Sequence, residues 1–308
     1  MNTWNALRAE TSRVLTKLGA DAPDREAAWI LEDASGLTAL ELHTQSDSRA
    51  PARVVATVQR MLEQRAAGMP IQYVLGHWAF RGLDLLVDTR VLIPRPETEW
   101  VVECALHALE PLGIPRGKRN QWTGTTTEHH IVDLGTGSGA IALAMAAELP
   151  HAQVWATEVS TDALTVARAN IAGTGATRVR LTEGSWFGAL PDELHGTVAC
   201  VISNPPYIGA SEWELLDHSV RDFEPLTALV GGPDGFEAIA EIISEAPEWL
   251  TPDGVLVIEL ASQQDERAQR AARDAGFTRT VIAPDLTGRA RALIAHMSDT
   301  GDPRNSNE

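Results

Sequence analysis

Cysteine is nearly absent from this chain, which has only Cys104 and Cys200 among its 308 residues. Cys200 lies inside an apolar run, so we expect neither a disulfide framework nor a cysteine metal site. The nine histidines show no H-x-x-x-H spacing, and the sequence contains no C-x-x-C pair and no G-x-S-x-G elbow. We therefore predict no metal, no covalent nucleophile and a reducing, cytoplasmic setting.

Long apolar runs and positive charge are also scarce. Residues 1–10 include Trp, Arg and Glu where a secretory segment would be continuously apolar, so we expect neither export nor membrane insertion. Lys and Arg number 25 against 42 Asp and Glu, a net charge of −17, and after residue 90 the ratio is 15 to 31. Nucleic-acid affinity depends on cations that displace counterions, so we expect no direct nucleic-acid binding. An acidic surface also serves solubility, and it would attract a basic protein loop.

What is present is enough chain for two domains, with 44% apolar and 22% charged residues. The first seventy residues carry apolar side chains at helical spacing, and Pro23 and Pro51 stand at plausible helix starts. Residues 71–93 hold short β-rich runs around glycines, which predicts a hairpin. We therefore expect a helical domain over 1–70, a hairpin linker over 71–93 and a larger domain over 94–308.

The larger domain alternates strand and helix patterns. After an opening helix over 94–109, apolar runs predict strands at 131–134, 154–157, 178–182, 198–203, 254–259, 277–282 and 292–296. This order predicts an α/β fold with a doubly wound, seven-stranded Rossmann-like sheet. We interpret the Pro, Gly and Thr-rich stretch 111–127 as a surface insertion and 297–308 as a frayed end.

A glycine-rich loop follows the first of these strands and runs into a helical pattern. Its residues are Gly135, Thr136, Gly137, Ser138 and Gly139. Glycines let the backbone approach a ligand closely, and a helix N-terminus offers free N–H groups. Glu158 ends the next strand, where a carboxylate would accept both hydroxyls of a ribose. The loop also fits G-x-G-x-x-[GA], so a nicotinamide cofactor stays open, and Glu158 can equally be a solvated charge.

The fourth strand ends in Asn204, Pro205, Pro206 and Tyr207. Open α/β sheets bind ligands outside the carboxyl ends of their strands. The prolines favour extended backbone at Asn204 and Pro205, so the side-chain oxygen of Asn204 and the carbonyl of Pro205 can face one cavity. Two acceptors suit a primary amide or amine, which has two N–H donors to satisfy. Tyr207 offers an aromatic face to a planar group or a cation. An ordinary strand-to-loop turn is the alternative.

Together these motifs resemble the HemK/PrmC family of class I S-adenosylmethionine-dependent methyltransferases, which methylate a glutamine side-chain amide in translation release factors. Trp186 follows the third strand, either near an adenine ring or in the core. Further blocks extend the resemblance over nearly the whole chain: Ile93–Glu99, Asp222–Leu229 and Pro284–Arg289. The four residues 204–207 alone would not suffice, because adenine-amino methyltransferases of DNA and RNA share them.

The resemblance implies S-adenosylmethionine as methyl donor, S-adenosylhomocysteine as product, and release factors as protein partners recruited by the helical domain. It places cofactor binding on residues 135–139, Glu158, Trp186 and Asn204, and the glutamine on residues 204–207, with Asn204, Pro205 and Tyr207 as catalytic residues. Many relatives carry Asp before the tryptophan where this chain has Ser185. A hydroxyl, a backbone group or Glu183 would then contact the adenine. A nucleic-acid adenine methyltransferase and a nicotinamide-binding module are the other hypotheses.

Overall fold

The computed structural model describes residues 3–114, 116–117 and 129–298. The chain divides into two compact units. The first contains the residues up to Trp78 together with Asp217–Phe223, and the second contains Ala79–Leu216 and the residues from Glu224 onward. Most of the expected insertion at 111–127 and of the expected frayed end at 297–308 lies outside the described residues. Within the described part, no helix is long and apolar enough to cross a membrane.

The first unit is helical, as its apolar spacing predicts. Its helices are α1 (Trp4–Lys17), α2 (Pro23–Ser35), α3 (Ala39–Thr44), α4 (Ala52–Ala66), α5 (Ile71–Leu75) and α9 (His218–Arg221). The apolar stripes of α2 and α4, including Ile30 and Val58, are buried in one core. Pro23 is the first residue of α2, where its missing N–H costs nothing.

The expected hairpin starts later than predicted. Residues 71–75 form the short helix α5 between Pro70 and Gly76, which has a φ of +77° and ends the helix. The hairpin itself consists of β1 (His77–Phe80) and β2 (Leu83–Leu86). A glycine at such a boundary fits a helix C-terminus and a strand start equally well, so the pattern alone did not separate them.

The second unit is built on a seven-stranded sheet within the described residues, as predicted. Its strands are β3 (His129–Leu134), β4 (Ala152–Glu158), β5 (Val179–Glu183), β6 (Val198–Ser203), β9 (Leu250–Glu259), β10 (Arg279–Pro284) and β11 (Ala290–His296). The spatial order is β10-β11-β9-β6-β3-β4-β5. β11 runs antiparallel to both neighbours, whereas the pairs formed among β3, β4, β5, β6 and β9 are parallel. A further small sheet joins β7 (Ile208–Gly209) and β8 (Val230–Gly232).

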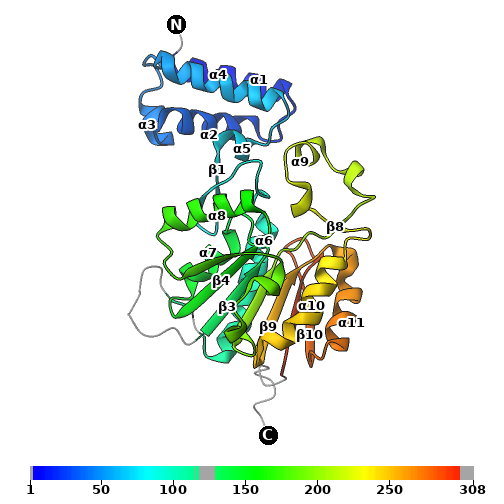
Figure 1. Cartoon of the computed structure of the whole chain (residues 1–308). Helices are drawn as coiled ribbons and strands as arrows, with labels where there is room; N and C mark the ends of the chain where they lie inside the picture. The colour runs from blue at the N-terminus through cyan, green and yellow to red at the C-terminus, as the bar shows by residue number, and fades with distance from the viewer. Residues whose placement is uncertain (1–2, 115, 118–128, 299–308) are drawn as a thin grey trace. The chain divides into compact units, whose positions relative to one another are not determined.

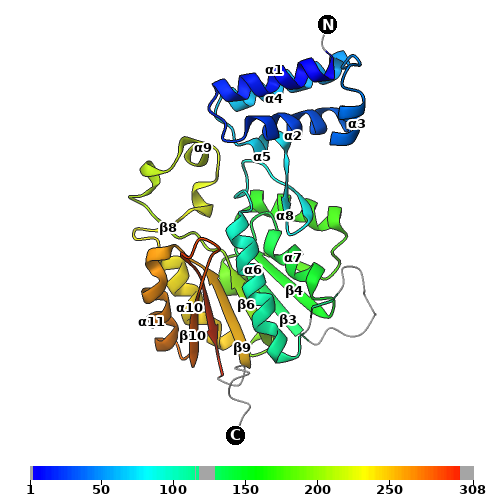
Figure 2. The ribbon, with the colours of Figure 1, turned by 180° about the vertical axis from the view of Figure 1, so that it is seen from behind.

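Helices cover both faces of the large sheet. The helices of this unit are α6 (Pro96–Leu109), α7 (Ala140–Glu148), α8 (Thr161–Thr174), α10 (Glu237–Trp249) and α11 (Asp265–Asp274). Along β3, Ile131 joins the core under α6 and α7, and Val132 joins the core under α10 and α11. Figure 1 shows α10 and α11 in front of the sheet, and the view from behind in Figure 2 shows α6 in front. Because the parallel strands are buried on both faces, they read as nearly continuous apolar runs.

The parallel strands also position the site. The carboxyl ends of β3, β4, β6 and β9 meet at one edge of the sheet. The glycine loop, Glu158, Asn204 and Glu259 therefore come together there, although they are far apart in the sequence.

Candidate active site

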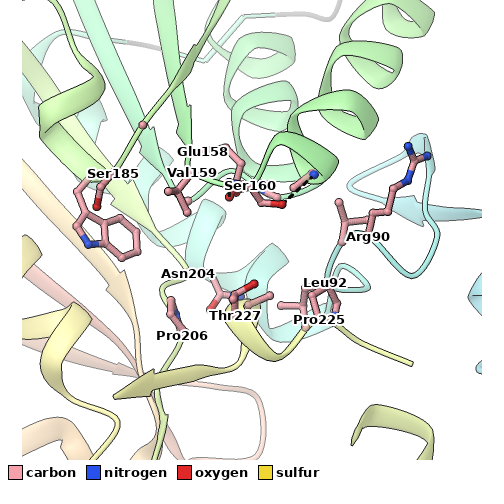
Figure 3. Close-up of a pocket in the computed structure, with 17 residues that line it drawn as sticks. Arg90, Leu92, Glu158, Val159, Ser160, Ser185, Asn204, Pro206, Pro225 and Thr227 are labelled. Carbon is pink, nitrogen blue, oxygen red and sulfur yellow. Dashed lines mark hydrogen bonds between the residues drawn. The ribbon is translucent and has the colours of Figure 1, made fainter. Parts of the chain in front are cut away.

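A pocket opens at this edge of the sheet (Figure 3). Its walls come from the ends of β3, β4, β5 and β6 and from two segments outside the sheet. Figure 3 shows Glu158, Val159 and Ser160 on one side and Asn204, Pro206, Pro225 and Thr227 on the other. The lining residues that the sequence motifs had singled out are Gly135, Gly137, Glu158, Trp186, Asn204 and Pro206.

The glycine loop has the conformation that its composition predicts. Gly135, Gly137 and Gly139 have φ angles of +72°, +57° and +86°, a region that other residues rarely adopt. Gly139 is the N-cap of α7. Gly135 and Gly137 line the pocket. Thr136 and Ser138 are buried and do not belong to its wall.

Asp133 anchors this loop, a role that no sequence motif indicated. Its side chain is 0% exposed. Its Oδ2 accepts hydrogen bonds from the Thr136 hydroxyl at 2.6 Å and from the Ala142 N–H at 3.0 Å. Its Oδ1 has no hydrogen-bond partner among the described residues. Burial, the largest influence, raises the pKa of Asp133 to about 7. The carboxyl thus ties the loop to the first turn of α7.

Glu158 lies beside the glycine loop. Its Oε2 accepts a hydrogen bond from the Gly137 N–H at 2.9 Å, and its Oε1 accepts one from the Ser160 N–H at 2.9 Å. These bonds hold the carboxylate at the pocket wall. Each carboxylate oxygen has two acceptor sites, so both oxygens keep one for a ligand.

Trp186 lies between the pocket and the core. It lines the pocket and also packs against the core under α10 and α11. Its φ of +41° is unusual for a residue with a large side chain. Ser185 lies beside it on the pocket wall, whereas Glu183 is exposed and is not part of that wall. Of the two side chains considered for the adenine, only Ser185 is near the pocket.

The four residues after β6 divide into two pairs. Asn204 and Pro206 line the pocket. Pro205 is buried, and neither it nor Tyr207 belongs to the pocket wall. The Tyr207 hydroxyl donates a hydrogen bond to Glu259 Oε1 at 3.4 Å, and burial raises its pKa. The aromatic face expected next to a substrate group is therefore turned into the protein in this structure.

The two acceptors expected on this loop have no internal donors. The Asn204 Nδ2 group donates a hydrogen bond to Thr98 Oγ1 at 3.1 Å, which leaves Oδ1 on the other side of the carboxamide. Within the described part of the chain, neither Asn204 Oδ1 nor the Pro205 carbonyl oxygen accepts a hydrogen bond. Both oxygens therefore keep their acceptor capacity, and Asn204 lies on the pocket wall.

Two pocket segments were missed as lining residues, Arg90–Leu92 and Pro225–Ala228. Arg95 and the buried Glu224 connect the backbone stretches next to these segments by an ion pair. Both residues lie in blocks that the family resemblance includes, Ile93–Glu99 and Asp222–Leu229. Their pairing was not predictable, because they are far apart in the sequence.

Comparisons with known proteins agree with this geometry. Residues 6–76 match the model of the PrmC N-terminal domain, and residues 121–221 match that of the methyltransferase small domain. A "release factor glutamine methyltransferase" from Streptomyces coelicolor is 38% identical, over 96% of this chain and 98% of that protein. The protein of the same name from Moorella thermoacetica is 37% identical, over 93% and 96%.

Solved structures agree on the fold. A methyltransferase from Pyrococcus furiosus superposes with a TM-score of 0.50 and 21% identity, covering 78% of this chain and 98% of that one. The hMettl16 catalytic domain, solved in complex with MAT2A 3'UTR hairpin 6, has a TM-score of 0.54 and 14% identity, covering 81% and 83%. These two show a shared α/β methyltransferase fold. Since the sequence relatives exceed 30% identity over almost their full length, the chain belongs to the release factor glutamine methyltransferase family.

Proposed function

We propose that this protein transfers a methyl group from S-adenosylmethionine to the side-chain amide nitrogen of the glutamine in the Gly-Gly-Gln motif of peptide chain release factors. The observation that carries the proposal is the pair of acceptors without internal donors in the described chain, Asn204 Oδ1 and the Pro205 carbonyl, at the end of β6. They stand next to a pocket formed by a glycine loop and a carboxylate. Family membership supports the same reaction.

The pocket residues fit the methyl donor. A side chain on Gly135 would come within 3.1 Å of the Trp186 ring, so the missing Cβ keeps space open there. Gly135–Gly139 would hold the methionine portion, Glu158 the ribose hydroxyls, and Trp186 with Ser185 the adenine. Asn204, on the wall of the same pocket, would be in reach of both ligands. S-adenosylmethionine supplies an electrophilic methyl group on a positively charged sulfur.

The residues after β6 would bind the glutamine. Asn204 Oδ1 and the Pro205 carbonyl each accept one hydrogen of the carboxamide, which needs both satisfied once it leaves water. Accepting both hydrogens also returns electron density to a nitrogen that amide resonance makes a poor nucleophile. Positioning of the reactants accounts for roughly 7–11 kcal/mol of the barrier in well-oriented intramolecular reactions. No general base is required, because the proton becomes acidic only after the transfer and can pass to water.

Pro206 and Tyr207 complete the loop. Pro206 restricts the backbone at the pocket wall, and Tyr207 supports it through its hydroxyl. Recruitment of the release factor belongs, in this proposal, to the helical unit, residues 1–70, which matches the PrmC N-terminal domain model. The 71–93 linker and the 94–308 methyltransferase domain complete the proposed division.

A nucleic-acid adenine methyltransferase would use the same chemistry, but the charges disfavour it. Arg90 is the only Lys or Arg among the residues of this pocket wall in the described chain, and its guanidinium is paired with Asp88. A phosphate backbone would meet a protein with a net charge of −17.

Mass spectrometry of a release factor incubated with the enzyme and S-adenosylmethionine tests the proposal. We expect one added methyl group, located on the glutamine of the Gly-Gly-Gln motif. A release factor with Asn in place of that Gln is the control and should stay unmodified. An unmodified wild-type release factor, or methylation of DNA or RNA oligonucleotides under the same conditions, would contradict the proposal. Calorimetric binding of NAD in place of S-adenosylmethionine would favour the nicotinamide-binding hypothesis.

A further inference from the structure

The carboxamide of Asn204 can face the pocket in two ways, and only one of them suits the reaction. With its oxygen inward it accepts an N–H from a bound amide. With its NH2 group inward, the Asn204 side chain would place its N–H donors against the N–H donors of the bound amide. In the structure the NH2 group points to Thr98, because Nδ2 donates a hydrogen bond to Thr98 Oγ1 at 3.1 Å.

Thr98 can receive this hydrogen because its own is already committed. The Thr98 hydroxyl donates to Glu259 Oε2 at 2.7 Å, and the two side chains are 4% and 1% exposed. A hydroxyl has one hydrogen, so toward Asn204 it presents only lone pairs. An inverted Asn204 would place its oxygen against that oxygen. The chain of bonds therefore has one direction, from Asn204 through Thr98 to Glu259.

We propose that Thr98 and Glu259 are positioning residues that set the orientation of the Asn204 carboxamide, so that its oxygen and not its NH2 group faces the substrate amide. The inference rests on the proposed function, since the inward oxygen matters only if an N–H donor is bound there. Glu259 holds the other end of the loop as well, because its Oε1 accepts the Tyr207 hydroxyl at 3.4 Å. One buried carboxylate thus orients both ends of the four-residue loop.

The direction of this hydrogen-bond chain depends on the charge of Glu259. The ionisable groups around it are Arg291 on β11, Glu97 on α6 and Tyr207. Burial, the largest influence, raises the pKa of Glu259 to about 7. A protonated carboxyl has a hydrogen of its own to donate, which lets the Thr98 hydroxyl turn toward Asn204 and permits the inverted carboxamide. Methylation should therefore decline as the pH falls through about 7.

The first test compares Thr98→Val with Thr98→Ser. Valine keeps the shape of threonine but lacks the hydroxyl, so kcat/KM for the release factor should fall roughly 10- to 100-fold, the range for one buried polar contact. The S-adenosylmethionine Kd should stay within about twofold, because Thr98 is not part of the pocket wall. Serine restores the hydroxyl and should recover most of the loss. Thr165→Val, at an exposed position on α8, is the matched control.

Glu259→Gln provides a second test that does not depend on Thr98. A glutamine carbonyl can still accept the Thr98 hydrogen, but the side chain no longer titrates. The wild-type kcat should decline on the acid side of about pH 7, and the variant should lose this limb of the profile. Melting temperatures identify variants that do not fold.

Three results would overturn the inference. These are a folded Thr98→Val enzyme within twofold of wild-type kcat/KM, a serine variant as impaired as the valine variant, or an acid limb that persists in Glu259→Gln. All three presuppose a wild-type enzyme that methylates the release factor. An inactive wild-type enzyme would instead overturn the proposed function, and the inference would go with it.

Discussion

The ring of Trp186 lies directly against Gly135, where a Cβ built on the glycine would come within 3.1 Å of the Trp186 Cζ3 atom. Two residues from the segments that follow different strands, β3 and β5, thus lie together on the pocket wall. A side chain at position 135 would require the Trp186 ring to shift by a few tenths of an ångström. The φ of +72° at Gly135 adds a second reason for glycine.

Gly135→Ala should therefore weaken cofactor binding. The added methyl group crowds the Trp186 ring and strains a backbone that alanine rarely adopts, and the backbone strain costs about 1–3 kcal/mol. We expect the Kd for S-adenosylmethionine, measured by calorimetry, to rise at least tenfold. Gly173→Ala is the control, because Gly173 lies in α8 with open space around its Cα and should leave the Kd unchanged. Equal affinities for the two variants would contradict the assignment of Gly135 to the cofactor site.

Asn204→Ala should abolish most of the turnover. The variant removes one acceptor for the substrate amide, and loss of a preorganised polar contact at a reacting centre typically costs roughly 10²-fold or more in kcat. Rates of release factor methylation with radiolabelled donor measure the effect. Near-wild-type turnover in a folded Asn204→Ala enzyme would refute the role of this side chain.

Asp133 should make stability depend on pH in a defined direction. Its pKa is about 7 in the folded protein against an ordinary value of 3.8, so the folded state binds the proton more tightly than the unfolded state. The stabilisation is complete below about pH 4 and is lost as the pH rises toward about 7. The melting temperature of Asp133→Asn minus that of the wild type should thus increase between pH 4 and 7 and then level off. A difference that stays constant over this range, measured by differential scanning fluorimetry, would show that Asp133 is ionised throughout.

Arg95→Ala should destabilise the protein and impair the pocket. Glu224 is buried, and burial raises its pKa despite the opposing effect of Arg95. Without Arg95 it loses its cationic partner, which should cost about 1–3 kcal/mol of folding free energy, measured by urea denaturation. Arg13→Ala, which breaks an exposed pair with Glu10, should cost less than about 1 kcal/mol. Similar losses in both variants would mean that Glu224 gains nothing from its partner.

Much of the fold was predictable because its signals are local. The apolar runs that became β3, β4, β5, β6 and β9 are short and continuous, as strands buried on both faces must be. The observed boundaries of these strands differ from the predicted ones by at most a few residues. The helix α5 was missed because five residues between a proline and a glycine carry too little periodicity to be distinguished from a strand start.

The site was predictable in part for the same reason. A glycine loop after a strand and an Asn-Pro-Pro-Tyr segment after another are visible as motifs, and the pocket does contain Gly135, Gly137, Glu158, Trp186, Asn204 and Pro206. The sequence did not show where the side chain of Tyr207 points. A tyrosine in a loop shows in the sequence only that it has a ring and a hydroxyl, whereas Glu259 decides where that hydroxyl goes.

The order of strands along the chain, the glycine conformations and the identity of the polar groups at the strand ends were determined by the sequence alone, because each depends on neighbours within a few positions. The tertiary structure alone decided which buried groups form hydrogen bonds with these polar side chains. Asn204 lies 106 positions from Thr98, and Thr98 lies 161 positions from Glu259, yet they form one chain of hydrogen bonds. A hydroxyl at a helix start and a carboxylate at a strand end look like surface residues in the sequence. The fold brings them to one edge of the sheet, where burial makes each polar group depend on a hydrogen-bond partner.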